Sequence, residues 1–393
     1  MRKRGIFLRL LSGILCAALL FCGCETVQET PPDADFIETE NDSMQVLFIN
    51  AGKADSALVV TASGAYLIDA GLESSVPAIG AALGSMGIHK LDAIFLTHTH
   101  SDHIGGAESI ARAYKADTIY APAISESPEK LSEIAVKCGA NYRTLNAGDR
   151  ISAGLGFSFE VLGPLSYNAD DDNDNSLVLM LSGLGKKILL AGDMQFPEEK
   201  TLLKAGADLS ADILKVGNHG NSDATSEEFV TAVSPSVAVI STDTTVDAGT
   251  ASKRVRKALS GSDIYLTQDG ELGVLAQVGL LGKISVSLAG RKKTGAQLVI
   301  ESLDTKEQTI TIKNSGRAAD ISGFMVYSTK GSELFVFPDG SSVAAGESVT
   351  VACEGRSGNY IWNEEKVWSK KKEDTAVLYD RYGNVLSKKS NLV

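Results

Sequence analysis

Cysteine, histidine and tryptophan are scarce in this sequence of 393 residues, which holds five, five and two of them. Three of the cysteines, Cys16, Cys22 and Cys24, fall near the amino terminus. The other two, Cys138 and Cys353, fall in different predicted domains, so we expect them to be unbridged and expect no disulfide framework. Stability must then come from buried apolar side chains, and 44% of the residues are apolar, which is typical of globular proteins.

Positive charge is also in short supply, because 37 Lys and Arg face 49 Asp and Glu and the formal net charge is −12. A surface that follows phosphates is normally basic, so the composition argues against general electrostatic binding to nucleic acid. Any action on nucleic acid must rest on local charge and on metal. The length exceeds that of one ordinary domain and predicts two domains after removal of a leader.

The amino terminus is typical of a leader peptide. Basic residues precede a short apolar run over residues 10–21, and Gly23 and Cys24 follow it. This pattern resembles a bacterial lipoprotein signal over residues 1–23, in which Cys24 becomes the lipidated first residue of the mature chain. A non-cleaved membrane anchor is the alternative, although the apolar run is short for a membrane span. Both interpretations predict an extracytoplasmic, membrane-anchored protein.

Residues 24–43 are acidic, contain two prolines and have few large apolar side chains. Such a segment cannot bury enough apolar surface to fold, so we expect it to be a flexible tether between lipid and folded protein.

The densest group of chemically active side chains lies in residues 91–106, LDAIFLTHTHSDHIGG. The apolar run AIFL predicts a buried strand that leads directly into three histidines and one aspartate. Residues at i, i+2 and i+4 of an extended segment project to one side, so His98, His100 and Asp102 can converge, with His103 turned in from the loop. Imidazole nitrogens with a carboxylate suit zinc or a similar first-row ion. The sequence therefore predicts a metal site at a strand-to-helix junction.

This stretch resembles the metallo-β-lactamase-fold hydrolases, whose HxHxDH signature is matched from His98 to His103. The resemblance implies an α/β fold of the αββα sandwich type over residues 44–290, with two divalent metal ions, zinc or manganese. Asp69, in LIDAG, matches an aspartate that supports the metal loop, and a turn or N-cap carboxylate is the alternative. Asp193, in AGD, matches the carboxylate that bridges the two metals and offsets their mutual repulsion.

Three further segments resemble the ComEC-type competence proteins: INAGKADSALV, NSLVL from Asn175, and ADILKVGNHGNSDATS, which holds Lys215 and His219. The resemblance makes His219 the distal imidazole of the second metal and implies hydrolysis of DNA phosphodiesters outside the cytoplasm. In such chemistry a metal-activated water attacks the phosphoryl group. Asp102 then orients or deprotonates that water, and Lys215 stabilises developing negative charge. A solvated lysine at a strand end is the alternative for Lys215, and we expect His89 to be exposed and structural.

The first metal position departs from the family pattern. No histidine lies between His103 and His219. His98 and His100 therefore have only Asn175 as a candidate third ligand, which would bind the metal weakly through its amide oxygen or merely hold a water molecule. We therefore expect this position to be partly occupied. We interpret the acidic run over residues 170–174 as a solvated loop. Thr250 stands where the ComEC-type proteins carry the histidine of a GHP motif.

The fold alone leaves the substrate open, because lactonases, thioesterases and β-lactamases share the same cage of ligands. Our main hypothesis is a surface-anchored nuclease or phosphodiesterase that acts on extracellular DNA or another phosphodiester, for DNA uptake or for nutrient scavenging. The alternatives are a metal-dependent ester or lactone hydrolase and a non-catalytic binding protein with a degenerate metal site. Metal content together with hydrolytic activity distinguishes them.

The pattern changes after a basic connector at residues 290–293. Short alternating strands separated by Gly, Asn and Asp turns predict an antiparallel, immunoglobulin-like β-sandwich over residues 294–393. This part resembles the lamin-tail domain through IKNSGRAADISGFMVYS, FVFPDGSSVAAGESVTV, Trp362, Trp368 and the closing AVLYDRYGNVL. The resemblance implies binding to a cell-surface ligand rather than chemistry. The lysines at 370–372 are a candidate contact for phosphate or an anionic wall polymer, and a solvated face is the alternative.

Overall fold

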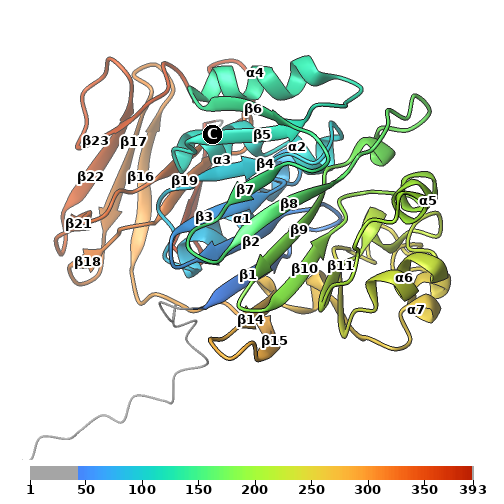
Figure 1. Cartoon of the computed structure of the whole chain (residues 1–393). Helices are drawn as coiled ribbons and strands as arrows, with labels where there is room; N and C mark the ends of the chain where they lie inside the picture. The colour runs from blue at the N-terminus through green and yellow to red at the C-terminus, as the bar shows by residue number, and fades with distance from the viewer. Residues whose placement is uncertain (1–42, 392–393) are drawn as a thin grey trace, which may run out of the picture. The chain divides into compact units, whose positions relative to one another are not determined.

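The computed structural model of the chain describes residues 43–391 (Figure 1). The predicted signal, the lipidation site at Cys24 and nearly all of the predicted tether lie outside the described residues. Within them, no helix combines the length and the apolar character needed to cross a membrane.

Two large sheets form the first part of the fold. In spatial order, the strands of the eight-stranded sheet are β15 (Ile284–Ala289), β14 (Gly273–Val278), β1 (Met44–Ile49), β2 (Ala57–Thr61), β3 (Gly64–Ile68), β4 (Ala93–Phe95), β5 (Thr118–Pro122) and β6 (Asn141–Leu145). Those of the seven-stranded sheet are β13 (Asp263–Leu266), β12 (Val237–Ile240), β11 (Ile213–Lys215), β10 (Lys186–Leu190), β9 (Val178–Gly183), β8 (Ser158–Gly163) and β7 (Arg150–Ser152). The first strand of the described chain therefore pairs with β14, more than 200 residues later.

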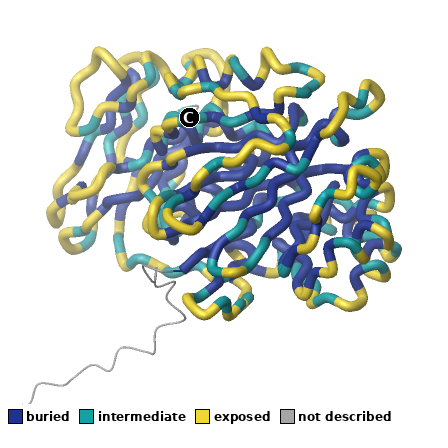
Figure 2. Tube along the Cα trace, in the orientation of Figure 1, coloured by how far each residue is buried: buried dark blue, intermediate teal, exposed yellow. Residues whose placement is uncertain are grey.

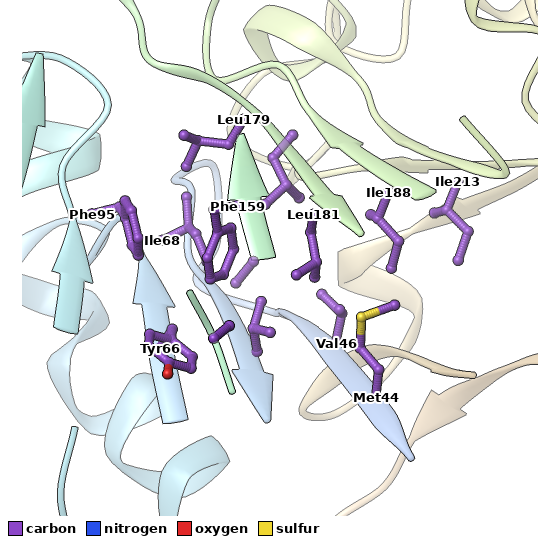
Figure 3. Close-up of a cluster of buried hydrophobic side chains, with 14 of the residues drawn as sticks. Met44, Val46, Tyr66, Ile68, Phe95, Phe159, Leu179, Leu181, Ile188 and Ile213 are labelled. Carbon is purple, nitrogen blue, oxygen red and sulfur yellow. The ribbon is translucent and has the colours of Figure 1, made fainter. Parts of the chain in front are cut away.

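Apolar side chains between the two sheets form the main core, part of which Figure 3 shows. Phe95 of β4 and Phe159 of β8 bring residues from both sheets into contact, with ring centroids 4.8 Å apart. Strand β1, MQVLFI, is buried at every position. Its alternate residues Met44, Val46 and Phe48 enter this core, whereas the residues between them face the helices. Because both faces of this strand are buried, its sequence is a nearly continuous run of apolar residues.

Helices cover the outer faces of both sheets, as the αββα prediction requires (Figure 1). Those beside the first sheet are α1 (Val76–Ser85), α2 (Ser101–Ile104), α3 (Ala107–Ala113) and α4 (Pro128–Cys138). Those beside the second are α5 (Phe196–Ala205), α6 (Glu227–Val233) and α7 (Lys253–Ala258). Four short 3₁₀ turns are η1 (Glu73–Ser75), η2 (Asp172–Asn175), η3 (Gly217–Gly220) and η4 (Thr267–Asp269). Leu202, Phe229 and Val255 anchor α5, α6 and α7 to the second sheet in a separate apolar cluster.

The remainder of the described chain is made of strands. One four-stranded sheet contains β16 (Leu298–Asp304), β17 (Thr309–Asn314), β22 (Ser348–Cys353) and β23 (Tyr360–Trp362). The other contains β20 (Leu334–Val336), β19 (Met325–Ser328), β24 (Thr375–Tyr379) and β25 (Val385–Ser390), and β18 (Ala319–Asp320) pairs with β21 (Ser342–Val343). A shared apolar core includes Trp362 and Trp368, whose ring centroids lie 5.7 Å apart. The predicted β-rich part is thus confirmed, and Cys138 and Cys353 are unbridged as expected.

One pairing in this part differs from the antiparallel prediction, because β22 and β23 are parallel. The connection runs back along β22 before β23 begins. Gly358 closely approaches the carbonyl of Thr350, and the side chain of Asn359 accepts a hydrogen bond from the Thr350 N–H at 2.8 Å. The chain therefore re-enters the sheet in the direction of β22, which alternation of apolar residues cannot reveal.

The β-rich part contacts α1, η1 and α3 of the first part. The Tyr327 hydroxyl donates to the carbonyl of Glu73 at 3.1 Å, and the Ser109 hydroxyl donates to the carbonyl of Ser332 at 2.6 Å. His89 lies at the same boundary, exposed as expected, with Nδ1 3.2 Å from a carboxylate oxygen of Asp339. The connecting residues 290–297 contain no helix or strand, and the predicted domain limits stay predictions.

Candidate metal centre

The signature residues follow β4 as the sequence predicts, but the backbone turns into a helix sooner than expected. His98 and His100 lie on the loop after β4, whereas Asp102 and His103 lie in α2. The side chains therefore converge through a helical turn rather than through one extended segment. His98 and His103 are fully buried, and their ring centroids lie 4.1 Å apart.

Four side chains from three separate parts of the sequence form one compact cluster. Asp102 and His103 come from α2, Asp193 follows β10, and His219 lies in η3, and ligand atoms of all four lie within 4.8 Å of one another. Asp193 Oδ2 is 3.2 Å from Nε2 of both His103 and His219. A carboxylate between two imidazoles is the arrangement that the resemblance predicted for the second metal position.

The chemistry of this cluster fits a divalent cation. Nε2 of His103 and Nε2 of His219 lie 3.2 Å from Asp193 Oδ2 but make no hydrogen bond, and Oδ1 of Asp193 makes none either. Buried polar atoms normally have partners, and a divalent cation would supply one for these three atoms. Burial lowers the pKa of His219, but the carboxylates of Asp193 and Asp55 outweigh this effect and raise it to about 10. The cluster therefore favours positive charge at the position where a metal ion would sit.

The first metal position is less complete. His98 Nε2 is buried and also lacks a hydrogen-bond partner, and the His100 ring lies 4.6 Å from the His98 ring, centroid to centroid. Neither residue belongs to the group of four within the described residues. The structure thus gathers His98 and His100 beside the cluster without a third acidic or imidazole ligand of their own.

Asp69 holds the metal loop from behind. Its Oδ1 accepts a hydrogen bond from the Thr97 N–H at 2.8 Å, and its Oδ2 accepts one from the Thr97 hydroxyl at 2.8 Å. Oδ2 also lies 2.8 Å from Nδ1 of His103. With Nδ1 fixed in this way, Nε2 of His103 faces Asp193, which is how outer carboxylates orient metal-binding imidazoles.

Asn175 is engaged by the protein itself. Its Oδ1 accepts from the N–H of Asn168 at 2.8 Å, and its Nδ2 donates to the carbonyl of Asn168 at 2.9 Å and to Asp172 at 3.0 Å. Asp172 in turn accepts hydrogen bonds from the N–H groups of Thr99 and Glu126. The amide therefore stabilises the metal loop through Asp172, and its oxygen is hydrogen-bonded to the N–H of Asn168.

The interpretation of residues 170–174 as a solvated loop is wrong for Asp172 and Asp174, whereas Asp170 is exposed. Asp172 and Asp174 are 3% and 1% exposed, and they lie in or beside η2. Asp174 accepts hydrogen bonds from the N–H groups of Gln195 and Glu198, just after Asp193. These carboxylates are buried because they satisfy backbone donors of the loops on either side of the metal cluster.

Lys215 lies behind the cluster rather than on its open side. It is 5% exposed, its Nζ pairs with Asp55, and it donates to the carbonyl of Val216 at 2.9 Å. Oδ1 of Asp55 is 3.5 Å from Nδ1 of His219, which also lies 3.1 Å from the carbonyl of Ser241. Lys215 is thus buried and paired with Asp55, and its predicted role at a substrate phosphate stays a prediction. Asp55 was missed in the sequence, although it lies in the segment INAGKADSALV.

The loop that carries His219 has an unusual backbone. Asn218 and His219 both have positive φ, 42° and 52°, a conformation that costs of order 1–3 kcal/mol for a non-glycine residue and clusters at functional sites. The Asn218 side chain donates to Asp223 at 3.0 Å. The Asn218 side chain therefore stabilises the turn that presents His219.

A partly exposed ion pair joins the loop after β1 to the loop that precedes Thr250. Lys53 and Asp247 form an ion pair at 2.5 Å, with side chains 29% and 33% exposed. Thr250, which replaces the family histidine, is buried, and its hydroxyl donates to the carbonyl of Asp247 at 2.8 Å. Asp102 is the most exposed of the four clustered ligands, with 29% of its side chain accessible. Of the four, Asp102 is therefore the residue that solvent reaches most easily.

Comparison with known proteins agrees with this geometry. Residues 49–244 match the model of the metallo-beta-lactamase superfamily, and the first part of this chain therefore has the metallo-β-lactamase fold. YhfI from Bacillus subtilis, a metallo-beta-lactamase fold protein, aligns with 60% of this chain and 100% of its own at 14% identity, with a TM-score of 0.43.

Curated relatives of this chain include a protein of the ComE operon and a competence protein. ComE operon protein 3 of Bacillus subtilis is 34% identical over 162 residues, which are 40% of this chain and 21% of that protein. Competence protein ComA of Neisseria gonorrhoeae is 32% identical over 204 residues, which are 51% of this chain and 27% of that protein. The chain thus spans less than a third of the length of the relatives that it matches.

Proposed function

We propose that this protein is a metal-dependent phosphodiesterase that cleaves DNA outside the cytoplasm. The observation that carries the proposal is the cluster of Asp102, His103, Asp193 and His219, in which buried nitrogen and oxygen atoms lack partners that a divalent cation would supply. The names of the competence relatives support DNA as the substrate.

Each side chain has a distinct role in this proposal. His103, Asp193 and His219 would hold the metal at one position, and His98 and His100 would hold a second ion beside it. A bound dication lowers the pKa of water toward neutrality and polarises the phosphoryl oxygen. Asp102, the accessible member of the cluster, accepts the proton of the attacking water and orients it. Lys53, which pairs with Asp247 in the structure, exchanges this partner for the substrate phosphate.

The test compares metal content and DNA cleavage in the full chain and in two variants. Asp193→Asn removes the central carboxylate charge, so it should lower both bound metal and cleavage. Asp208→Asn is the matched control, because it removes an exposed carboxylate that pairs with Lys187 at 2.7 Å, away from the metal residues. Undiminished cleavage by metal-free protein would refute the mechanism.

The same assay separates the alternative functions. Hydrolysis of esters or lactones without cleavage of DNA would assign the cluster to a different substrate class. Full metal occupancy with no hydrolysis of any phosphodiester or ester would favour a non-catalytic binding protein.

We also propose that the protein is a lipoprotein attached to the membrane through Cys24, and that the β-rich part is a lamin-tail-like domain that binds a cell-surface ligand. The leader pattern supports the anchor, and the four-stranded sheets around Trp362 and Trp368 suit a binding domain. The substitution Cys24→Ser should block lipid attachment. The protein should then be released from the membrane or remain as an uncleaved precursor. Unchanged processing and membrane retention would contradict the anchor.

A further inference from the structure

Three strongly exposed leucines lie at the tips of two β-turns. Leu281 and Leu280, between β14 and β15, are 98% and 62% exposed, and Leu155, between β7 and β8, is 95% exposed. Figure 2 shows the turn after β14 as an exposed projection from the body. Single exposed leucines are common on protein surfaces, but two adjacent ones at the end of a protruding turn place apolar side chains where nothing within residues 43–391 covers them.

The two turns belong to the same end of the fold. Gly282 approaches the carbonyl of Leu184 in the turn between β9 and β10. On the neighbouring strand end, Gly183 approaches the side chains of Phe157 and Met44. The turns after β7, β9 and β14 and the start of β1 are therefore contiguous, although they come from both sheets.

This end lies opposite the metal cluster. Strand β10 begins at Lys186 beside the turn and ends at Leu190, three residues before Asp193. Strand β1 likewise begins at Met44, paired with Val278 next to the exposed leucines, and ends at Ile49 before the loop that carries Asp55. The strands thus run from the turn end to the metal end.

The described chain also enters the fold at the turn end, since Met44 is the first residue of β1. The residues between the proposed lipidated Cys24 and Met44 can span roughly 65 Å if fully extended. Such a tether alone would leave the body free to rotate above a bilayer. It also raises the effective concentration of the turn end near the lipid, so that a small apolar contact becomes significant.

We propose that the turn end is a membrane-docking surface, in which Leu281, Leu280 and Leu155 insert into the interfacial region of a lipid bilayer and direct the metal cluster away from it. Two observations favour a bilayer over a protein as the binding partner. The proposed tether joins the fold at this end, and Lys283, exposed beside Leu281, suits anionic headgroups. This inference rests on the proposed anchor at Cys24 but not on the proposed phosphodiesterase activity. It assigns the membrane-facing and solvent-facing ends of the protein.

The experiment measures which end of the anchored protein touches lipid. The full chain is placed in vesicles of phosphatidylethanolamine and phosphatidylglycerol, with or without brominated acyl chains, which quench nearby indoles. Leu281→Trp reports on the turn end. Val246→Trp is the matched control, because Val246 is 72% exposed in the loop next to Asp247 at the metal end. The chain's own Trp362 and Trp368 are buried and provide the constant background.

The expected result is a blue shift of the Leu281→Trp emission and a loss of its intensity in brominated vesicles, with neither change for Val246→Trp. The additional substitution Lys283→Glu should reduce the quenching in anionic vesicles but not in vesicles of phosphatidylcholine alone. Equal quenching at both positions, or none at either in protein that floats with the vesicles, would overturn the proposed orientation.

Two further outcomes identify other causes. A blue shift that depends on protein concentration in the absence of vesicles would assign the leucines to contact with a second copy of the chain. Failure of the full chain to float with vesicles would refute the anchor and this orientation together, whereas cleavage of DNA is measured separately and its loss would refute only the proposed function.

Discussion

The buried pair of Lys215 and Asp55 offers the sharpest test of how the metal centre is supported. Their side chains are each 6% exposed, and Asp55 faces the Nδ1 side of His219. The substitution Lys215→Met removes one charge and keeps most of the side-chain volume. Because it leaves the carboxylate of Asp55 buried without its partner, we expect it to lower the free energy of unfolding by about 3–5 kcal/mol.

The double substitution Asp55→Asn with Lys215→Met removes both charges, so most of this loss should be recovered. Metal binding should respond differently, since Asp55 lies behind His219 and loss of such outer carboxylates typically weakens metal affinity by roughly 10- to 100-fold. Urea unfolding of metal-free protein measures the first effect, and titration with zinc measures the second. The reasoning would be refuted if Lys215→Met cost less than about 1 kcal/mol, or if the double variant were as unstable as the single one.

Three further predictions follow from buried contacts. Burial raises the pKa of the Glu198 carboxyl from 4.5 to about 7, so the folded state binds its proton more tightly than the unfolded state and stability falls as the pH rises between these values. Glu198→Gln should therefore raise the free energy of unfolding by up to about 3 kcal/mol near pH 8 and leave it unchanged near pH 4, as measured by urea unfolding. Gly84→Ala should lower the melting temperature because its methyl group would overlap the carbonyl of Arg381, whereas Gly261→Ala, in open space, should not. Asn175→Ala removes the brace on the metal loop and should make one metal ion per chain easier to remove with a chelator; equal loss of metal from the unsubstituted chain would contradict this role.

Much of the metal centre could be predicted because its residues follow apolar strands. His98 and His103 come after β4, and Asp193 comes after β10, at positions where a strand end leaves the sheet. The association of His219 with them required a family resemblance, because periodicity does not tell which loops meet across the two sheets. The order of the sheets in this part likewise depends on pairings such as β1 with β14 that no local pattern specifies.

The errors have a common physical origin. Asp172 looks like a surface residue in a run of acidic side chains, but it is buried because the N–H of Thr99 lies within 2.9 Å of it and needs an acceptor. The alternative of a solvated Lys215 is wrong in the same way, because its side chain is buried and paired with Asp55. In both cases the residue that pairs with the buried side chain lies more than 70 residues away in the sequence. Residue type alone therefore identifies a charged side chain but does not tell whether it is buried or exposed.

The contact between the two parts had a signal in the sequence. Helix α1, VPAIGAALGS, has no charged residue and is apolar around most of its circumference, which is typical of a helix covered on two sides. One side faces β1, and the other meets the β-rich part, where Gly80 lies against the sulfur of Met325. A separately expressed first part would expose that second side.

This contact connects the β-rich part with the metal loop. The Tyr327 hydroxyl donates to the carbonyl of Glu73 in η1, and the N–H of Glu73 lies against Gly105, directly after α2. Because Gly105 and Gly106 have no side chains, the end of α2 packs directly against η1. A displacement of η1 would therefore displace the helix that carries Asp102 and His103. The β-rich part therefore contacts the segment that packs directly against the metal loop.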